Sequence, residues 1–206
     1  MPTYKTAPSE SSMSSIIGHL AAGAAVHLSR SRCTDPQART ALPLLLFLAI
    51  APDLDYLPLW LLGTTSSARF SHSLLFCLAL STVIWLLFLP VRRKNASFPG
   101  WLALFIASCS HLVLDMLVGL HPLPLLWPCS FNVSMPVGLL PSAGKLQLAN
   151  YYLWRNLLIE SGVLLPVLWF VTNLFRGRSI RSVAAKTALV APVWAGFLVW
   201  SIAIHG

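Results

Sequence analysis

Residues 100–120 read GWLALFIASCSHLVLDMLVGL, and this stretch decides the class of fold. It is long enough to cross a membrane as a helix, which takes about 20 mostly apolar residues. His111 and Asp115 interrupt it four residues apart, so they share one face of that helix. Ionisable groups in an apolar span are costly to keep there and tend to be functional. The stretch therefore predicts a membrane helix that carries a polar site.

The rest of the chain has the same apolar character. Of its 206 residues, 56% are hydrophobic and only 10% are charged, whereas soluble domains carry about 25% charged residues. Apolar runs predict helices at residues 13–29, 41–51, 72–91, 100–120, 149–175 and 183–204, and a short apolar piece at 56–63 continues the second of them. We expect an all-α, multi-pass membrane bundle of about six helices. Residues 1–206 would form one integral membrane domain with a polar tail at 1–12.

Two segments depart from regular spans. The sequence Pro52-Asp53-Leu54-Asp55 breaks the second helix, and a broken span is tolerated only where it lines a cavity in the protein. Residues 121–148 are rich in Pro, Gly, Ser and Leu and show little periodicity. They predict a long outer loop that caps one end of the bundle.

The basic residues indicate how the bundle is oriented. They gather in alternate connections, at residues 30–40, 92–94 and 176–186, which antiparallel spans would place on one side. The positive-inside rule assigns that side to the cytoplasm. The intramembrane His and Asp residues then lie in the extracytoplasmic half of a cell (inner) membrane. The net charge of +8 is explained by these loops, so we expect no nucleic-acid partner.

His111 and Asp115 could bind one metal ion from a single helical face, because imidazole and carboxylate are common metal ligands. The alternative is a hydrogen bond that only joins two helices. Asp53 and Asp55 would repel each other without a cation between them, unless they form a polar surface turn. His72 follows Ser71, a plausible N-cap, so it is either a ligand or a solvated histidine at a helix start.

Further polar residues have two interpretations each. His19, in a helix rich in Gly and Ala, is either a ligand or a core histidine bonded to a carbonyl. Glu160 shares a helical face with Asn156, and a buried Glu needs a partner. That partner could be a metal, an Arg or a metal-bound His, and we favour the last. His121, in the outer loop, is assigned a similar supporting role.

Several short motifs occur in a characteristic order. They are Gly18-His19, Ala51-Pro52-Asp53-Leu54-Asp55, Ser71-His72-Ser73-Leu74-Leu75, Ser110-His111-Leu-Val-Leu-Asp115 and Pro124-Leu-Leu-Trp-Pro128. In this order they resemble the YdjM-type family of LexA-regulated, membrane-bound, metal-dependent hydrolases over roughly residues 16–160. The resemblance implies a metal site formed by His19, Asp53, Asp55, His72, His111 and Asp115.

The chain also departs from that family. Many members carry His-Arg-Gly where this chain has Ser67-Ala68-Arg69, so a further ligand is missing. Where many members have Gly after the His-Asp helix, this chain has His121-Pro122. The spacing of His111, Asp115 and His121 is similar to that of zinc-dependent phospholipases C. This similarity favours a lipid phosphoester as substrate.

These observations together predict a metal-dependent hydrolase that acts on a phosphoester or related bond of a membrane lipid or lipid-like substrate. Asp53, Asp55 and His72 would be catalytic as well as metal-binding, and Arg69 and Arg155 would hold the substrate. Zinc is the expected metal, with Mn or Fe as alternatives and one or two ions. A transporter or proton relay and a non-catalytic membrane scaffold are the competing interpretations.

Overall fold

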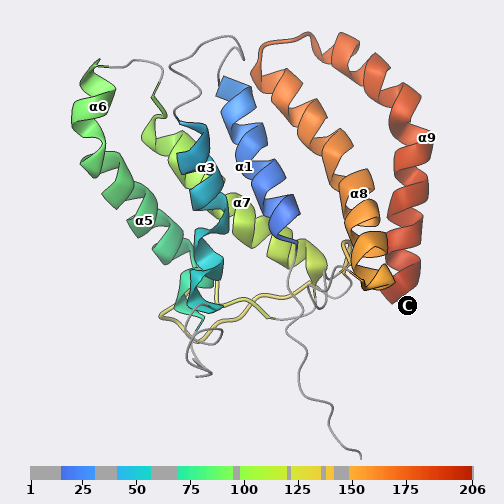
Figure 1. The fold of residues 1–206 in the computed structure, drawn as a ribbon, viewed down its shortest axis with the longest axis horizontal. Helices are drawn as coiled ribbons and strands as arrows, with labels where there is room; N and C mark the ends of the chain where they lie inside the picture. Colours follow the sequence, from blue (N-terminus) through green and yellow to red (C-terminus); the bar gives the residue numbers. More distant parts are fainter. Residues whose placement is uncertain are drawn as a thin grey trace, which may run out of the picture.

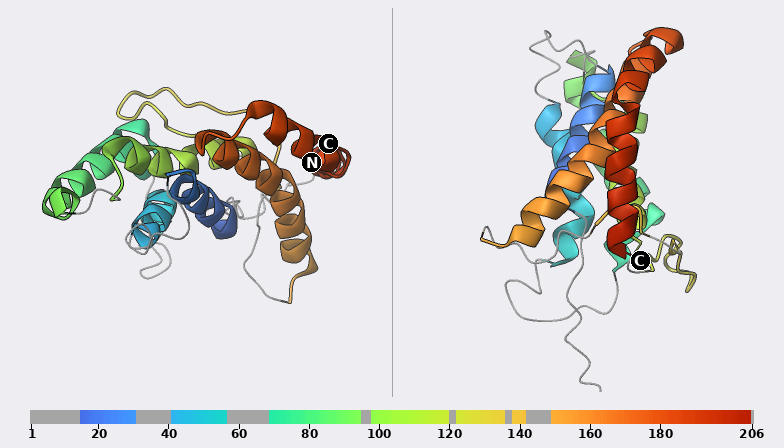
Figure 2. Two further views of the ribbon diagram at one scale, coloured as in Figure 1. Left: turned by 90° about the horizontal axis from the view of Figure 1, so that it is seen from above. Right: turned by 90° about the vertical axis from the view of Figure 1, so that its right-hand side faces the viewer.

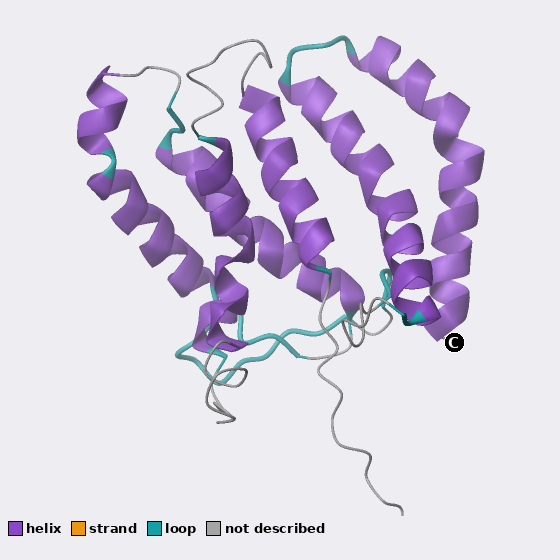
Figure 3. Ribbon diagram, in the orientation of Figure 1, coloured by secondary structure: helices purple, strands orange, loops and turns teal. Residues whose placement is uncertain are grey.

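The computed structural model describes residues 15–30, 41–56, 69–94, 98–119, 122–135, 138–141 and 149–205. Within these ranges every regular element is helical (Figure 3), apart from one isolated antiparallel bridge between Leu123 and Val133. The α-helices are α1 (Ile16–Arg30), α3 (Leu42–Ile50), α5 (Leu74–Leu87), α6 (Leu89–Lys94), α7 (Trp101–Val118), α8 (Tyr151–Phe175) and α9 (Ile180–His205). Two 3-10 helices follow α3 and precede α5, namely η1 (Ala51–Tyr56) and η2 (Phe70–His72). The predicted all-α bundle is confirmed.

Among the described residues, three helices are long and apolar enough to cross a membrane by length and composition: Trp101–Val118, Tyr151–Phe175 and Ile180–Ile204. Others are shorter: α1 has 15 residues and the apolar α5 has 14. At 1.5 Å per residue these reach about 21–23 Å, less than the roughly 30 Å of a bilayer core. The described helices are therefore unequal in length, as the predicted ranges were.

Helix α1 lies at the centre of the bundle (Figure 1), where it packs against α3, α7 and α8. Helix α7 also packs against α3 and α5, whereas α9 packs mainly on α8. Seen from above, α1 and α3 lie on the same side of α7 (Figure 2). This arrangement places the start of α1 and the end of α7 beside the break that follows α3.

The contact between α1 and α3 depends on a glycine. A Cβ atom on Gly23 would lie 2.9 Å from the Leu45 carbonyl oxygen and 3.0 Å from the Ala49 Cβ atom. Small residues at such a crossing let two membrane helices approach closely and gain van der Waals contact. The close approach fixes the height of Ala49 relative to α1.

The predicted break at Pro52 is confirmed. Helix α3 ends at Ile50, and η1 carries Pro52, Asp53 and Asp55. Proline has no N–H to continue the hydrogen bonding of an α-helix, and the chain tightens into a 3-10 turn. The predicted apolar piece at residues 56–63 lies almost wholly outside the described residues.

The helix predicted at residues 72–91 is wrong at both ends. Ser73, not Ser71, is the N-cap: its hydroxyl accepts a hydrogen bond of 3.1 Å from the Phe76 N–H. At the other end α5 stops at Leu87, and α6 starts with Leu89 and Pro90. A proline fits the first turn of a helix but not its interior, so the apolar run is divided there.

The described part of residues 121–148 is a loop that crosses one end of the bundle (Figure 1). The Leu74 N–H, at the start of α5, donates to the Leu125 carbonyl oxygen at 3.0 Å. The N–H groups of Leu139 and Leu140 donate to the Leu117 carbonyl oxygen, near the end of α7. The loop therefore satisfies backbone groups at two helix ends, as a capping loop should.

The basic residues gather at the opposite end of the bundle. Arg30 ends α1, Lys94 ends α6, and Arg176 follows α8, all at the upper side of Figure 1. This agrees with the predicted alternation of basic connections. The side of the membrane that this end faces stays a prediction.

Candidate metal centre

Six polar residues from four segments meet at the end of the bundle opposite the basic residues. His19 lies in the first turn of α1, Asp53 and Asp55 on η1, His72 in η2, and His111 and Asp115 on α7. We call these six residues the His/Asp cluster. All six were predicted as metal ligands, and the fold brings all six together.

Asp115 lies at the centre of the His/Asp cluster. Its Oδ1 atom is 3.6 Å from His19 Nε2, and its Oδ2 atom is 3.3 Å from both His72 Nε2 and His111 Nε2. The contact to His111 uses the i, i+4 spacing on α7. One carboxylate therefore contacts all three histidines of the cluster.

Asp53 supplies a second carboxylate to the same place. Its Oδ1 atom lies 3.5 Å from His111 Nε2 and 3.7 Å from His72 Nε2. The Nε2 atoms of these two histidines thus each face oxygen atoms from both Asp53 and Asp115. The break in α3 is what turns Asp53 toward α7.

The other nitrogen of His111 fixes the orientation of its ring. His111 Nδ1 lies 2.9 Å from the Ala49 carbonyl oxygen. Because a carbonyl oxygen can only accept, Nδ1 carries the proton. In the neutral ring Nε2 then offers a lone pair toward carboxylate oxygens, which also only accept. His111 Nε2 is buried and has no hydrogen-bond partner among the described residues, so a cation between these acceptors would satisfy it.

The spacing of the ligand atoms also fits a shared ion. The five distances from the histidine Nε2 atoms to Asp53 and Asp115 run from 3.3 to 3.7 Å. Most N–H···O hydrogen bonds are shorter, at about 2.7–3.2 Å. Two ligands held about 2.0–2.2 Å from one ion at a tetrahedral angle are about 3.3–3.6 Å apart. The donor set therefore fits a divalent metal ion.

Two groups within the cluster could hold such an ion: one is His19, His111 and Asp115, and the other is Asp53, His72 and His111. The rings of His19 and His111 are stacked, with centroids 3.8 Å apart. His111 belongs to both groups, and its Nε2 has one lone pair to give. It can bind only one ion at a time, so the two groups share a single central position through this residue.

Asp55 contacts His72 from the other side of the ring. Asp55 Oδ2 lies 3.3 Å from His72 Nδ1 and accepts a hydrogen bond of 2.7 Å from the Ser71 hydroxyl. A carboxylate on the far nitrogen of a histidine orients the ring and raises its basicity as a ligand. Its contacts thus favour a positioning role, while direct binding of metal by Asp55 stays a prediction.

Burial differs between the two kinds of side chain. The three histidines are at most 1% exposed, while Asp53 and Asp115 are 13% and 14% exposed. The carboxylates therefore form the side of the centre that a substrate or water molecule can reach.

The two predicted substrate-binding arginines have different surroundings. Arg69 directly precedes η2, and its carbonyl oxygen accepts a hydrogen bond of 3.1 Å from the His72 N–H. Arg155, on α8, donates to the Asn156 side-chain oxygen and stacks over the Tyr152 ring. Arg69 thus belongs to the turn that carries the cluster, whereas the contacts of Arg155 lie within α8.

Glu160 was predicted to support a metal-bound histidine, but its carboxylate instead lies at the start of α1. A Cβ atom on Gly18 would collide with Glu160 Oε1, and the Glu160 carboxylate lies close to Ser15. The N-terminus of a helix favours a negative charge, which explains this location. Asn156 serves as the acceptor for Arg155, and His121 lies outside the described residues.

The chain matches the YdjM inner membrane protein family over residues 13–204. It belongs to this family. The match spans the whole His/Asp cluster and all the described helices but the last residue of α9. The resemblance carried by the short motifs is therefore confirmed. No curated protein and no solved structure matches the chain.

Membership in the YdjM family agrees with the long apolar helices, and both make this protein a membrane protein. It carries a buried His/Asp group that could bind a metal ion. Sequence reasoning missed two groups that organise this centre, the Ala49 carbonyl and the Ser71 hydroxyl. A backbone carbonyl leaves no signal in a sequence, while a serine beside a helix start suits a cap equally well.

Proposed function

We propose that this YdjM-family protein is a membrane-embedded, metal-dependent hydrolase that acts on a phosphoester or related bond of a membrane lipid. The observation that carries the proposal is the buried His111 Nε2 atom, which faces oxygen atoms of Asp53 and Asp115 at 3.5 and 3.3 Å. A proton relay or a helix-joining scaffold would not need three histidines and two carboxylates to face one point. Zinc fits this donor set and spacing best.

His111, Asp115, Asp53 and His72 would hold the ion, and His19 would complete the shell. When bound there, a divalent ion would supply Lewis-acid chemistry, which activates water at neutral pH and polarises the bond to be cleaved. The Asp53 side chain is 13% exposed, unlike the buried histidines. It would accept the proton that the attacking water releases.

Two further residues would position the reactants. Asp55, held by the Ser71 hydroxyl at 2.7 Å, keeps the His72 ring in place. Arg69 precedes the η2 turn and supplies a guanidinium for the anionic oxygens of a phosphoester. The location of the centre between membrane helices favours a substrate that already resides in the bilayer.

The test is a hydrolysis screen with purified protein loaded with Zn²⁺ or Mn²⁺. Vesicles of phosphatidylglycerol and phosphatidylethanolamine are the first substrates, and the released headgroup is measured by mass spectrometry. We expect cleavage by the wild type and its loss in Asp115→Asn. The His27→Gln variant, at a buried histidine in another part of α1, should remain active. Stoichiometric metal without cleavage of any lipid substrate would refute the hydrolase and leave the metal centre standing.

A further inference from the structure

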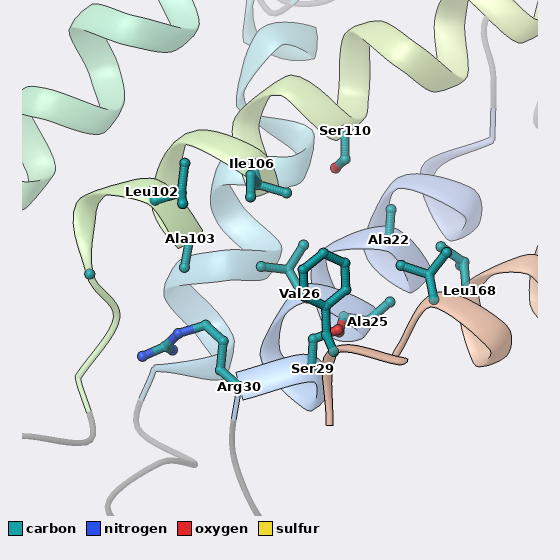
Figure 4. Close-up of a pocket in the computed structure, with 13 residues that line it drawn as sticks. Ala22, Ala25, Val26, Ser29, Arg30, Leu102, Ala103, Ile106, Ser110 and Leu168 are labelled. Carbon is teal, nitrogen blue, oxygen red and sulfur yellow. The ribbon is translucent and has the colours of Figure 1, made fainter. Parts of the chain in front are cut away.

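A second feature of the bundle lies away from the His/Asp cluster. A groove of about 490 Å³ runs between α1, α7 and α8, with a lining that is almost entirely apolar. Its walls include Ala25 and Val26 of α1, Ala103 and Ile106 of α7, and Leu168 of α8 (Figure 4). Its volume is that of a ligand site, and its position between membrane helices opens it to lipid chains.

The two ends of the groove differ in chemistry. Ser110 lies at one end and Arg30 at the other (Figure 4). Arg30 is exposed and ends α1, eleven residues after His19, which is about 16 Å along the helix. The charged end of the groove is therefore at the basic end of the bundle, well separated from the His/Asp cluster.

Other arginines reinforce the positive charge at this end. Arg92, on α6, is close enough to interact electrostatically with Arg30. The Arg176 Nε–H donates to the Leu28 carbonyl oxygen at 2.8 Å, which brings its guanidinium to the last turn of α1. Three arginines from separate helices thus lie near the charged end of the groove, and Arg30 itself lines it. Basic pockets between membrane helices on the cytoplasmic side are suited to anionic lipid headgroups.

We propose that this groove binds one anionic phospholipid, with an acyl chain against Ala25, Val26 and Ala103 and the phosphate on Arg30. The guanidinium and the phosphate are complementary in charge and can form paired hydrogen bonds. The apolar wall of the groove would contact the acyl chain in place of neighbouring lipid chains. The phosphate-binding end of this site is separate from the His/Asp cluster, because Arg30 lies at the other end of α1.

The test measures lipid binding to purified protein by native mass spectrometry. Three probes separate the contribution of the phosphate to binding from that of the acyl chains. They are dioleoyl phosphatidylglycerol, dioleoylglycerol with the same chains but no phosphate, and glycerol 3-phosphate with no chains. We expect one phosphatidylglycerol per chain, bound about tenfold more tightly than dioleoylglycerol, because dioleoylglycerol lacks the phosphate that forms charge-assisted hydrogen bonds with Arg30. Glycerol 3-phosphate alone should not be retained.

Matched variants test each half of the site. Arg30→Gln should abolish the preference for phosphatidylglycerol, while Arg178→Gln, at an exposed arginine in the connection between α8 and α9, should keep it. Ala103→Phe should fill the groove and weaken both lipids at least about tenfold. Ala184→Phe, on the exposed face of α9, should not. If Ala103→Phe does not fold, Ala25→Leu fills the groove from α1.

Equal lipid binding by Arg30→Gln and Arg178→Gln would overturn the proposal. So would equal binding by the groove-filling variant and Ala184→Phe, because the bound lipid would then be bulk lipid around the bundle. Metal content measured on the same samples reports on the His/Asp cluster separately. A loss of lipid binding with unchanged metal is the result that the proposal requires.

Discussion

His111 Nδ1 lies 2.9 Å from the carbonyl oxygen of Ala49 and thereby joins α7 to the last turn of α3. The last carbonyl groups of a helix have no partner within that helix. Pro52, three residues on, has no N–H with which to close a 3-10 hydrogen bond to this oxygen. The break in α3 therefore does two things: it leaves an acceptor for His111 and turns Asp53 toward the same histidine.

This relationship predicts that Pro52→Ala weakens metal binding. An alanine N–H at this position could donate to the Leu48 carbonyl oxygen and allow α3 to continue, and the N–H of residue 53 would then take the Ala49 carbonyl oxygen from His111. We expect metal affinity to fall by about 10- to 100-fold, the usual effect of losing a group that orients a ligand. Competition with a fluorescent chelator measures the affinity. Pro43→Ala is the matched control, because Pro43 lies in the first turn of α3, where the missing N–H interrupts no helical hydrogen bond. Equal metal affinity of the two variants would disprove the link between the break at Pro52 and metal binding.

Substitutions of Asp55 and Asp115 should weaken metal binding to different degrees. Asp55→Asn keeps the size of the side chain but weakens its hold on His72 Nδ1, 3.3 Å away. We expect metal affinity to fall about 10- to 100-fold. Asp115→Asn removes the carboxylate that contacts three histidines and should abolish stoichiometric binding. Isothermal titration with Zn²⁺ separates the outcomes, and complete loss in Asp55→Asn would instead make Asp55 a direct ligand.

The Gly23→Ala variant should loosen the α1–α3 contact. Its Cβ would press on the Leu45 carbonyl oxygen, a backbone atom that cannot move aside easily. We expect a loss of about 1–3 kcal/mol in stability together with weaker metal binding, since Ala49 would move. Gly196→Ala, which has open space at its Cβ in α9, should be neutral or slightly stabilising. Thermal unfolding in detergent compares the two, and a Gly23→Ala protein as stable as Gly196→Ala would contradict the packing argument.

The orientation of the bundle can be tested with a native thiol. Cys129 is exposed in the capping loop, whereas Cys77 is buried in α5. In a Cys33→Ser background, a membrane-impermeant maleimide applied from outside intact cells or spheroplasts should label Cys129. A Ser179→Cys variant that also carries Cys33→Ser and Cys129→Ser should be labelled only after lysis, because residue 179 lies at the basic end. The reverse pattern would place the His/Asp cluster on the cytoplasmic side.

The sequence was most informative about helices and about ligands within one helix. Long apolar runs predicted α7, α8 and α9 well, because burial in lipid leaves few alternatives to a helix. The i, i+4 spacing of His111 and Asp115 is by itself enough to predict that they share a helical face. Pro52 marked the break after α3 for an equally local reason.

Long-range relationships could not be predicted in the same way. Glu160 looked like a partner for a metal-bound histidine, yet its carboxylate lies against Gly18 and Ser15. Nothing local in the sequence shows which helix faces α8. The start of α5 was misjudged because Ser71 and Ser73 are equally good caps by residue type. Only the fold shows that the Ser71 hydroxyl donates to Asp55, while the Ser73 hydroxyl caps the helix.

Elemental analysis of the purified protein tests the central claim most directly. The claim is that the His/Asp cluster holds a divalent metal ion between His111, Asp53 and Asp115. The account predicts at least one tightly bound metal ion per wild-type chain, and none in a folded variant that combines His111→Gln with Asp115→Asn. A wild-type protein without stoichiometric metal, or a double variant that keeps its full metal content, would contradict it.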